Sequence, residues 1–272
     1  MSHLAFSTGR VAVVTGAASG IGLAACKKFA ELGMKIWMTD VTSDALQAAA
    51  DELRVQTDVL AIGVDVAELE QLNDFADQVF GHFGEVAVLM NNAATRNPAG
   101  CWQGYADWQK TMDVNMWGVI NGVQAFTQRM IEQSQSSVIV NTGSKQGITN
   151  PPNNPPCNVA KAAVKSYTEL LQHELRNTAD CQVSAHLLVP GWTTTGSAEH
   201  KLGAWLPGRV IDMMIAAISN GDFYIICPDD ETTPDMDKQR ILWGAQDITE
   251  NRPPLSRWHP DFKQVFEAQT PK

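Results

Sequence analysis

Three glycines in the run TGAASGIG (residues 15–22) have the spacing of an anion-binding turn. The run follows an apolar, β-branched segment and precedes a helical pattern at residues 23–32, which is the context that this motif requires. Gly16 lets the chain turn sharply, Gly20 lets the backbone approach a phosphate, and Gly22 lets the next helix pack closely. The first turn of a helix offers free N–H groups and the positive end of its dipole. We therefore expect this turn to bind the pyrophosphate of a dinucleotide.

Two acidic residues that follow strand-like segments extend this expectation. Asp40 lies near the spacing from the glycine turn at which an acid contacts the adenosine ribose. Its carboxylate can accept hydrogen bonds from the ribose hydroxyls and repels a 2′-phosphate, and no Lys or Arg lies in the turn or directly after Asp40. The cofactor predicted from these residues is NAD and not NADP. Asp65 either approaches the adenine or caps the next helix, and both alternatives stay open.

The elements that must position these residues are visible in the apolar pattern. Seven β-branched, apolar segments predict strands at residues 11–15, 35–40, 59–64, 86–91, 138–142, 183–189 and 223–227. Segments of helical periodicity lie between them, for example an apolar stripe at every third or fourth position within residues 69–83. Strands that alternate with helices predict a parallel sheet with helices on both faces. The predicted fold class is therefore α/β, a doubly wound parallel sheet of about seven strands in a single domain.

Two segments interrupt the alternation, and a tail follows it. Residues Gln146–Pro156 contain four prolines and are predicted to be a stiff loop, whereas Pro190–Pro207 is a candidate lid over a substrate. Residues 1–228 are predicted to be one domain, and residues 229–272 a C-terminal extension with a helix that starts at Pro234. Because the extension carries two tryptophans, we expect it to pack on the body or on a neighbouring subunit.

Composition excludes several classes of function. The 272 residues include 30 acidic and 20 basic side chains, a formal net charge of −10, so neither nucleic acid nor an anionic membrane surface is an expected partner. No apolar run approaches the roughly 18 residues of a membrane span, and the N-terminus lacks the pattern of a secretory signal. Five scattered cysteines without a C-x-x-C pair fit free thiols in a reducing compartment. We expect a cytoplasmic protein without a metal site.

The ordered motifs of the chain resemble the short-chain dehydrogenase/reductase family. The resemblance covers about residues 8–228, and its motifs are TGAASGIG at 15–22, Asp65, NNAA at 91–94, Asn115, Ser144, Lys161 and Pro190-Gly191. NNAA stands where NNAG is usual. The resemblance implies a Rossmann-like sheet, the reversible oxidation of an alcohol to a ketone with a nicotinamide cofactor, and a homotetramer or homodimer.

The resemblance also assigns residues to the cofactor. Asn91 would brace the sheet, Ala93 would lie beside the cofactor, and the segment that begins at Pro190 would flank the nicotinamide. The complete set of expected cofactor-binding residues is Gly16, Ser19, Gly20, Ile21, Gly22, Asp40, Asp65, Val66, Asn92, Ala93, Ala94, Lys161, Pro190, Gly191, Thr193 and Thr195.

One residue departs from the family's catalytic pattern. Members carry a Tyr four residues before a Lys, with a Ser about a dozen residues upstream; here Ser144 and Lys161 are present, but Cys157 occupies the Tyr position. The phenol, whose pKa near 10 is lowered by the Lys and the oxidised cofactor, takes the proton of the alcohol. By resemblance, Ser144 would hold the substrate oxygen, and Asn115 would anchor a water that connects Lys161 to solvent.

A cysteine at position 157 changes the expected chemistry. Its pKa, about 8.5 before perturbation, is suitable, but the side chain is shorter than Tyr by a ring and is not expected to reach the substrate oxygen. Since general acid–base catalysis contributes about 10²–10⁴-fold, we expect impaired activity. Three interpretations stay open: a substitution, natural or introduced, in an ordinary dehydrogenase; a silent NAD(H)-binding regulatory or scaffold protein; or a nucleophilic thiolate activated by Lys161. The first is favoured, because Asn115, Ser144 and Lys161 remain.

The substrate pocket is expected between the loop at residues 95–97 and the two interrupting segments. Its expected lining residues are Ser144, Gln146, Ile148, Trp192 and Trp205. The apolar members indicate a small hydrophobic alcohol or ketone, and core packing or a subunit contact is the alternative for each tryptophan. Arg96 either pairs with a substrate carboxylate or is a solvated surface side chain.

Overall fold

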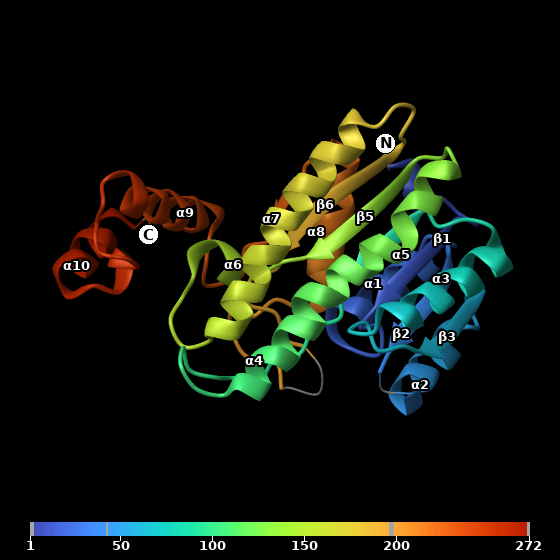
Figure 1. The fold of residues 1–272 in the computed structure, drawn as a ribbon, viewed down its shortest axis with the longest axis horizontal. Helices are drawn as coiled ribbons and strands as arrows, with labels where there is room; N and C mark the ends of the chain where they lie inside the picture. The colour runs from blue at the N-terminus through green and yellow to red at the C-terminus, as the bar shows by residue number, and fades with distance from the viewer. Residues whose placement is uncertain (1–2, 42, 196–198, 271–272) are drawn as a thin grey trace.

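The computed structural model describes residues 3–41, 43–195 and 199–270 (Figure 1). At its centre lies a seven-stranded sheet in the order β3-β2-β1-β4-β5-β6-β7. All neighbouring strands run parallel. The strands are β1 (Val11–Thr15), β2 (Lys35–Asp40), β3 (Val59–Gly63), β4 (Val88–Asn91), β5 (Ser137–Thr142), β6 (Val183–Val189) and β7 (Tyr224–Ile226). This order confirms the predicted doubly wound α/β fold, and it reverses between β1 and β4, where ligands bind in such sheets.

Helices cover both faces of the sheet. They are α1 (Gly20–Glu31), α2 (Ser43–Leu53), α3 (Leu69–Phe83), α4 (Tyr105–Met112), α5 (Gly118–Glu132), α6 (Gln146–Thr149), α7 (Pro155–Asn177) and α8 (Pro207–Asn220). Alternate residues of one strand enter opposite cores: Val14 packs in the core formed with α1, α2 and α8, whereas Val13 packs in the core formed with α3, α5 and α7. Burial on both faces explains why the strands are nearly continuous apolar runs.

Three strands, β3, β5 and β7, differ from their expected bounds by one residue at one or both ends, and two other segments differ by more. The segment Gln146–Pro156 is not simply a loop, because it holds the short helix α6 and the start of α7. α6 ends at Asn150 in the left-handed conformation (φ 47°), and prolines stand at the first positions of α7, where their missing N–H groups cost nothing. β4 begins two residues later than expected, because the N–H of Val86 donates to the side chain of Gln133 and not to a strand.

The chain after β7 forms α9 (Pro234–Thr249), the 3-10 turn η3 (Ser256–Trp258) and α10 (Pro260–Gln269), and these elements project from the body (Figure 1). The helix that was expected to start at Pro234 is confirmed; Thr233 caps it by accepting a hydrogen bond from Met236 N. Trp243 is buried within the extension, where it packs against Phe266 and donates to Ser256 Oγ (2.7 Å). The division into a domain at 1–228 and an extension at 229–272 stays a proposal.

Within the described parts of the chain, no helix combines the length and the apolar character needed to cross a membrane.

Candidate active site

The glycine turn joins β1 to α1 at the carboxyl edge of the sheet. Gly16 has a left-handed backbone (φ 65°), and a Cβ placed on Gly22 would lie 2.2 Å from the carbonyl oxygen of Gly16. Gly22 is therefore required by the turn itself, in addition to the helix packing that the sequence indicated. Ser19, the N-cap residue of α1, makes no side-chain capping hydrogen bond. The first N–H groups of the helix are thus available to an anion.

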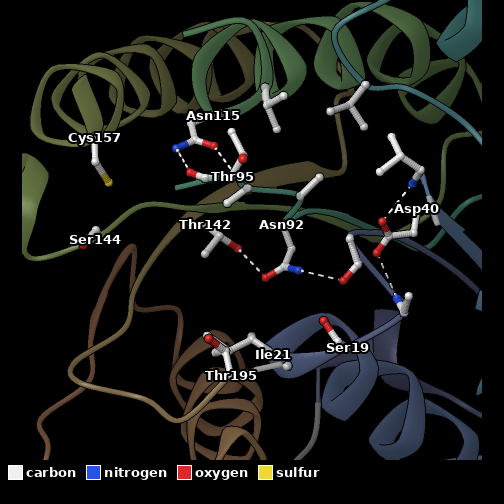
Figure 2. Close-up of a pocket in the computed structure, with 18 of the residues that line it drawn as sticks. Ser19, Ile21, Asp40, Asn92, Thr95, Asn115, Thr142, Ser144, Cys157 and Thr195 are labelled. Carbon is white, nitrogen blue, oxygen red and sulfur yellow. Dashed lines mark hydrogen bonds between the residues drawn. The ribbon is translucent and has the colours of Figure 1, made fainter. Parts of the chain in front are cut away.

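Asp40 lies beside this turn, at the end of β2 (Figure 2). One carboxylate oxygen accepts a hydrogen bond from Ala18 N (3.1 Å), and the other accepts one from Val41 N (2.8 Å). The carboxylate is thereby fixed at the wall of the cavity, where its remaining lone pairs can accept further hydrogen bonds.

Asp65 also lines the cavity, but it does not cap the helix that follows it. The N-cap residue of α3 is Glu68, and the carboxylate of Asp65 accepts a hydrogen bond from Ala67 N (3.0 Å) instead. The capping alternative is therefore wrong, and contact of Asp65 with the adenine stays a prediction.

Side chains that follow β1, β4 and β5 tie the three strand ends together. The Asn92 amide donates to Thr15 O (3.1 Å). Its oxygen accepts a hydrogen bond from the Thr142 hydroxyl (3.4 Å) (Figure 2). One residue earlier, the Asn91 amide donates to Asn141 Oδ1 on the neighbouring strand (2.9 Å), a contact of the bracing kind that the resemblance implies. The floor of the cavity is thus held by hydrogen bonds between strands.

Lys161 is a buried cation on α7. Its Nζ donates to the carbonyl oxygen of Thr142 (2.6 Å), and the side chain is 5% exposed. Burial lowers the pKa of Lys161 to about 8, although Cys157 acts in the opposite direction. Ser144, which follows β5, accepts a hydrogen bond from Gln146 N through its Oγ (3.2 Å). Both residues line the cavity.

Cys157 lies one helical turn before Lys161 and is half-buried at the same end of the cavity (Figure 2). Its thiol donates to Gln146 Oε1 (3.0 Å). Burial raises the pKa of Cys157, and the charges of Lys161 and Arg96 reverse this only in part. The group is therefore a neutral thiol at neutral pH, which argues against the interpretation as an activated thiolate.

Asn115 lies in a five-residue π-helical turn, η2 (Asp113–Trp117), which continues into α5. Its Oδ1 accepts a hydrogen bond from Thr95 N (2.7 Å) and its Nδ2 donates to Thr95 O (2.9 Å) (Figure 2). Such turns are frequent at functional sites. The resemblance implies that Asn115 anchors a water; the structure shows its side chain bound to the backbone of Thr95 in the loop after β4.

One cavity of about 840 Å³ brings most of the expected residues together. Its wall includes Gly16, Ser19, Gly20, Ile21, Asp40, Asp65, Val66, Asn92, Ala93, Ala94, Asn115, Ser144, Cys157, Lys161, Pro190 and Thr195. The glycine turn and Asp40 therefore share one cavity with Cys157 and Lys161. Of the two threonines proposed to flank the nicotinamide, Thr195 is on this wall, whereas the Thr193 hydroxyl donates to Gly191 O (3.0 Å).

Most residues expected in the substrate pocket lie outside this wall. Trp205 is buried in a core and donates to Asp230 Oδ1 (2.9 Å), so it follows the core-packing alternative. Ile148 packs against a small core formed by residues of α5, α7 and β6, namely Val119, Val164, Leu187 and Val189. Gln146 contacts the site through Cys157, and Trp192 is partly exposed.

Gly191 is not on the cavity wall, and several residues that are on the wall were not expected there. A Cβ on Gly191 would lie 2.7 Å from Pro228 O, so this glycine serves the packing of the segment after β7. Thr95, of the loop expected to bound the pocket, lies on the wall. Residues on the wall that the sequence did not indicate are Ala18, Val41, Ala45, Val64, Lys110, Val114, Thr142 and Gly143. Several directly follow strands, and that position is a signal that could have identified them.

Comparison with known proteins agrees with this geometry. The family model "short chain dehydrogenase" matches residues 10–204. The 1-deoxy-11-beta-hydroxypentalenate dehydrogenase of Streptomyces avermitilis is 37% identical over 146 residues, 52% of this chain and 53% of that protein. The human 15-hydroxyprostaglandin dehydrogenase (NAD(+)) is 31% identical over 198 residues, 70% and 71% of the two chains. This chain thus spans about half the length of the first of these relatives.

Solved structures show the same arrangement. The crystal structure of a short chain dehydrogenase/reductase from Burkholderia phymatum in complex with NAD superposes with a TM-score of 0.83 at 32% identity. The superposition covers 91% of this chain and 96% of that chain, so nearly the entire fold described above is shared.

Proposed function

Because this chain belongs to the short-chain dehydrogenase/reductase family, we propose that it is an NAD(H)-dependent oxidoreductase that interconverts a secondary alcohol and a ketone. The observation that carries the proposal is the single cavity in which the glycine turn meets Ser144, Cys157 and Lys161. The relatives named above are dehydrogenases of hydroxyl-bearing compounds, which supports this reaction class.

The residues of the turn fit a dinucleotide. The space kept open by Gly16 and Gly22 and the available N–H groups of α1 would receive a pyrophosphate. The fixed carboxylate of Asp40 would receive the ribose hydroxyls, and the uncharged Val41 beside it offers nothing to a 2′-phosphate. The NAD in the Burkholderia structure supports the same choice. When bound, the nicotinamide supplies the acceptor or donor of a hydride.

The residues at the other end of the cavity would handle the proton of the alcohol. Ser144 Oγ would hold the substrate oxygen, and Lys161, with its pKa lowered to about 8 by burial, is able to lose or gain a proton near working pH. Cys157 stands where the family has a phenol, but its thiol is bound to Gln146 and burial raises its pKa. We therefore propose that this chain turns over slowly.

The test compares the wild type with Cys157→Tyr in the oxidation of a panel of hydrophobic secondary alcohols, followed by NADH absorbance. We expect the Tyr variant to be faster by about 10²-fold or more. Cys157→Phe is the matched control, because it adds the ring without the hydroxyl and should stay slow. If both wild type and Tyr variant bind NADH but oxidise nothing, the redox proposal fails for that panel.

A second candidate function is a silent NAD(H)-binding regulatory or scaffold protein. The hydrogen bond that engages the Cys157 thiol favours it, since no free acid or base then stands at this position. This alternative predicts tight NADH binding without turnover in both the wild type and Cys157→Tyr. For either function we propose a homotetramer or homodimer, which sedimentation of the purified protein would test.

A further inference from the structure

We propose that Arg96 selects substrates that carry a carboxylate, so that the alcohol or ketone handled at this site belongs to a hydroxy or oxo acid. The inference rests on the proposed function and names its substrate class. Arg96 is exposed and is not itself on the cavity wall, but it directly follows Thr95, which lines the cavity and is held by the side chain of Asn115.

Arg96 is set apart from the other arginines of the described chain. Each of the eight others has a partner: Glu85 for Arg10, Asp51 for Arg54, Asp77 for Arg129, His173 for Arg176, Asp230 for Arg209, Thr232 for Arg240, Glu250 for Arg252 and the Trp258 ring for Arg257. With the described residues, Arg96 makes no ion pair, hydrogen bond or aromatic stack. Its planar guanidinium keeps its full capacity for two parallel hydrogen bonds to a carboxylate.

The backbone that carries Arg96 is held on both sides. Thr95 is bound through both its N–H and its C=O to the Asn115 side chain (2.7 and 2.9 Å) (Figure 2). The Asn97 amide donates to Thr95 Oγ1 (3.1 Å), which fixes the following turn. An arginine on a fixed backbone loses less conformational entropy on binding than one on a free loop, and this smaller loss makes the free energy of ligand binding more favourable.

The charges around the catalytic end leave a place for an anion. Lys161 is buried there without a carboxylate within ion-pair distance among the described residues. Lys145, next to Ser144, is already neutralised by Asp237 (2.7 Å) and Asp229 (3.5 Å).

The two carboxylates on the cavity wall, Asp40 and Asp65, follow β2 and β3, on the side of β1 opposite to the strands that lead to Ser144. Arg96 acts on the catalytic end electrostatically, because its charge is among those that lower the pKa of Cys157. In a chain of net charge −10, these two cations, which have no ion-pair partner among the described residues, attract an anionic substrate and add no such attraction for a neutral one.

The test uses matched ligands of one carbon skeleton. The protein–NADH complex is titrated with 4-oxo-4-phenylbutanoate and with its neutral methyl ester, and binding is followed by NADH fluorescence, which needs no turnover. We expect the wild type to bind the acid more tightly than the ester by about tenfold, the effect of a charge-assisted bidentate pair. Arg96→Ala should abolish this preference, whereas Arg96→Lys should retain part of it. Lys263→Ala, which removes the same charge from the exposed face of α10, is the control and should keep the preference.

Two outcomes overturn the inference. One is equal binding of acid and ester by the wild type, and the other is a preference that survives Arg96→Ala. Neither outcome contradicts the redox proposal, because that proposal has a separate test, the oxidation of neutral alcohols by Cys157→Tyr. Conversely, an acid preference that depends on Arg96 supports the substrate class even in a protein that proves to be catalytically silent.

Discussion

Lys145 Nζ lies 2.7 Å from a carboxylate oxygen of Asp237, so the residue beside Ser144 is tied to the first turn of the C-terminal extension. Asp229 is the second carboxylate near this ammonium (3.5 Å), and it also accepts a hydrogen bond from Trp192 N (3.0 Å). A buried charge cluster therefore joins the loop after β5, the segment after β6 and α9. We infer that the extension supports the wall on which Ser144 lies.

The first prediction concerns this cluster. Asp237→Asn should lower the free energy of unfolding by about 1 kcal/mol, because it removes the ion pair with Lys145 while Asp229 still accompanies that lysine. The burial that raises the pKa of Asp237 offsets part of the attraction within this pair. Asp235→Asn, on the exposed side of the same turn, should be nearly neutral and serves as the control. A double-mutant cycle with Lys145→Met, measured by urea unfolding, gives the coupling energy. A coupling near zero would show that the pair contributes nothing.

The crossing of α6 and α7 provides a second prediction. A Cβ on Gly147 would lie 2.3 Å from the carbonyl carbon of Lys161, which is backbone and cannot turn aside. Gly147→Ala must therefore separate the two helices, and we expect a loss of about 1–3 kcal/mol in urea unfolding.

Gly81→Ala is the matched control for this substitution, because it lies within α3 with open space around it. It should be neutral or stabilising by up to about 1 kcal/mol. If Gly147→Ala behaves like Gly81→Ala, the close approach of α6 to Lys161 does not exist in solution.

These relationships also show what the sequence could and could not predict. The sheet and the glycine turn depend on local signals, namely strand and helix periodicity and the position of glycines, and both were predicted correctly. The pairing of Lys145 with Asp237 joins residues far apart in the chain, and no local pattern marks it. The position of Trp205 was undecided for a similar reason: a tryptophan in an apolar segment can face either a cavity or a core.

The same limit applies to Asn115 and Thr95. A conformation in which one asparagine clamps a loop through both ends of its amide depends on the π-helical turn, and a single extra residue in a helical turn leaves no clear pattern in the sequence.

A third prediction concerns pH. Burial lowers the pKa of Lys161 to about 8, below its ordinary value of 10.5. Between these two values the unfolded chain holds more protons than the native protein, so the contribution of this lysine to the free energy of unfolding rises with pH. We expect the free energy of unfolding of the wild type, minus that of Lys161→Met, to rise between about pH 8 and pH 10 in urea unfolding. Lys165→Met is the control. If its free energy of unfolding differs from that of the wild type with the same pH dependence, the assignment to Lys161 is wrong.

The last prediction concerns the choice of cofactor at Asp40. Asp40→Asn keeps an oxygen that can accept a hydrogen bond from Ala18 N or Val41 N, but it removes the charge that repels a 2′-phosphate. We expect the affinity for NADPH relative to NADH to rise by about tenfold, as the loss of a close charge repulsion at a partly buried site allows. Fluorescence titration with the two reduced cofactors measures the ratio.

Asp65→Asn is the control, since it removes one negative charge from the same cavity wall beyond the end of β3. It should leave the ratio of NADPH to NADH affinity close to that of the wild type. An equal change in both variants would mean that the overall charge of the cavity, and not the carboxylate held against the glycine turn, discriminates between the cofactors. A ratio that neither variant changes would place the discrimination elsewhere, and the preference for NAD proposed from Asp40 would then be wrong.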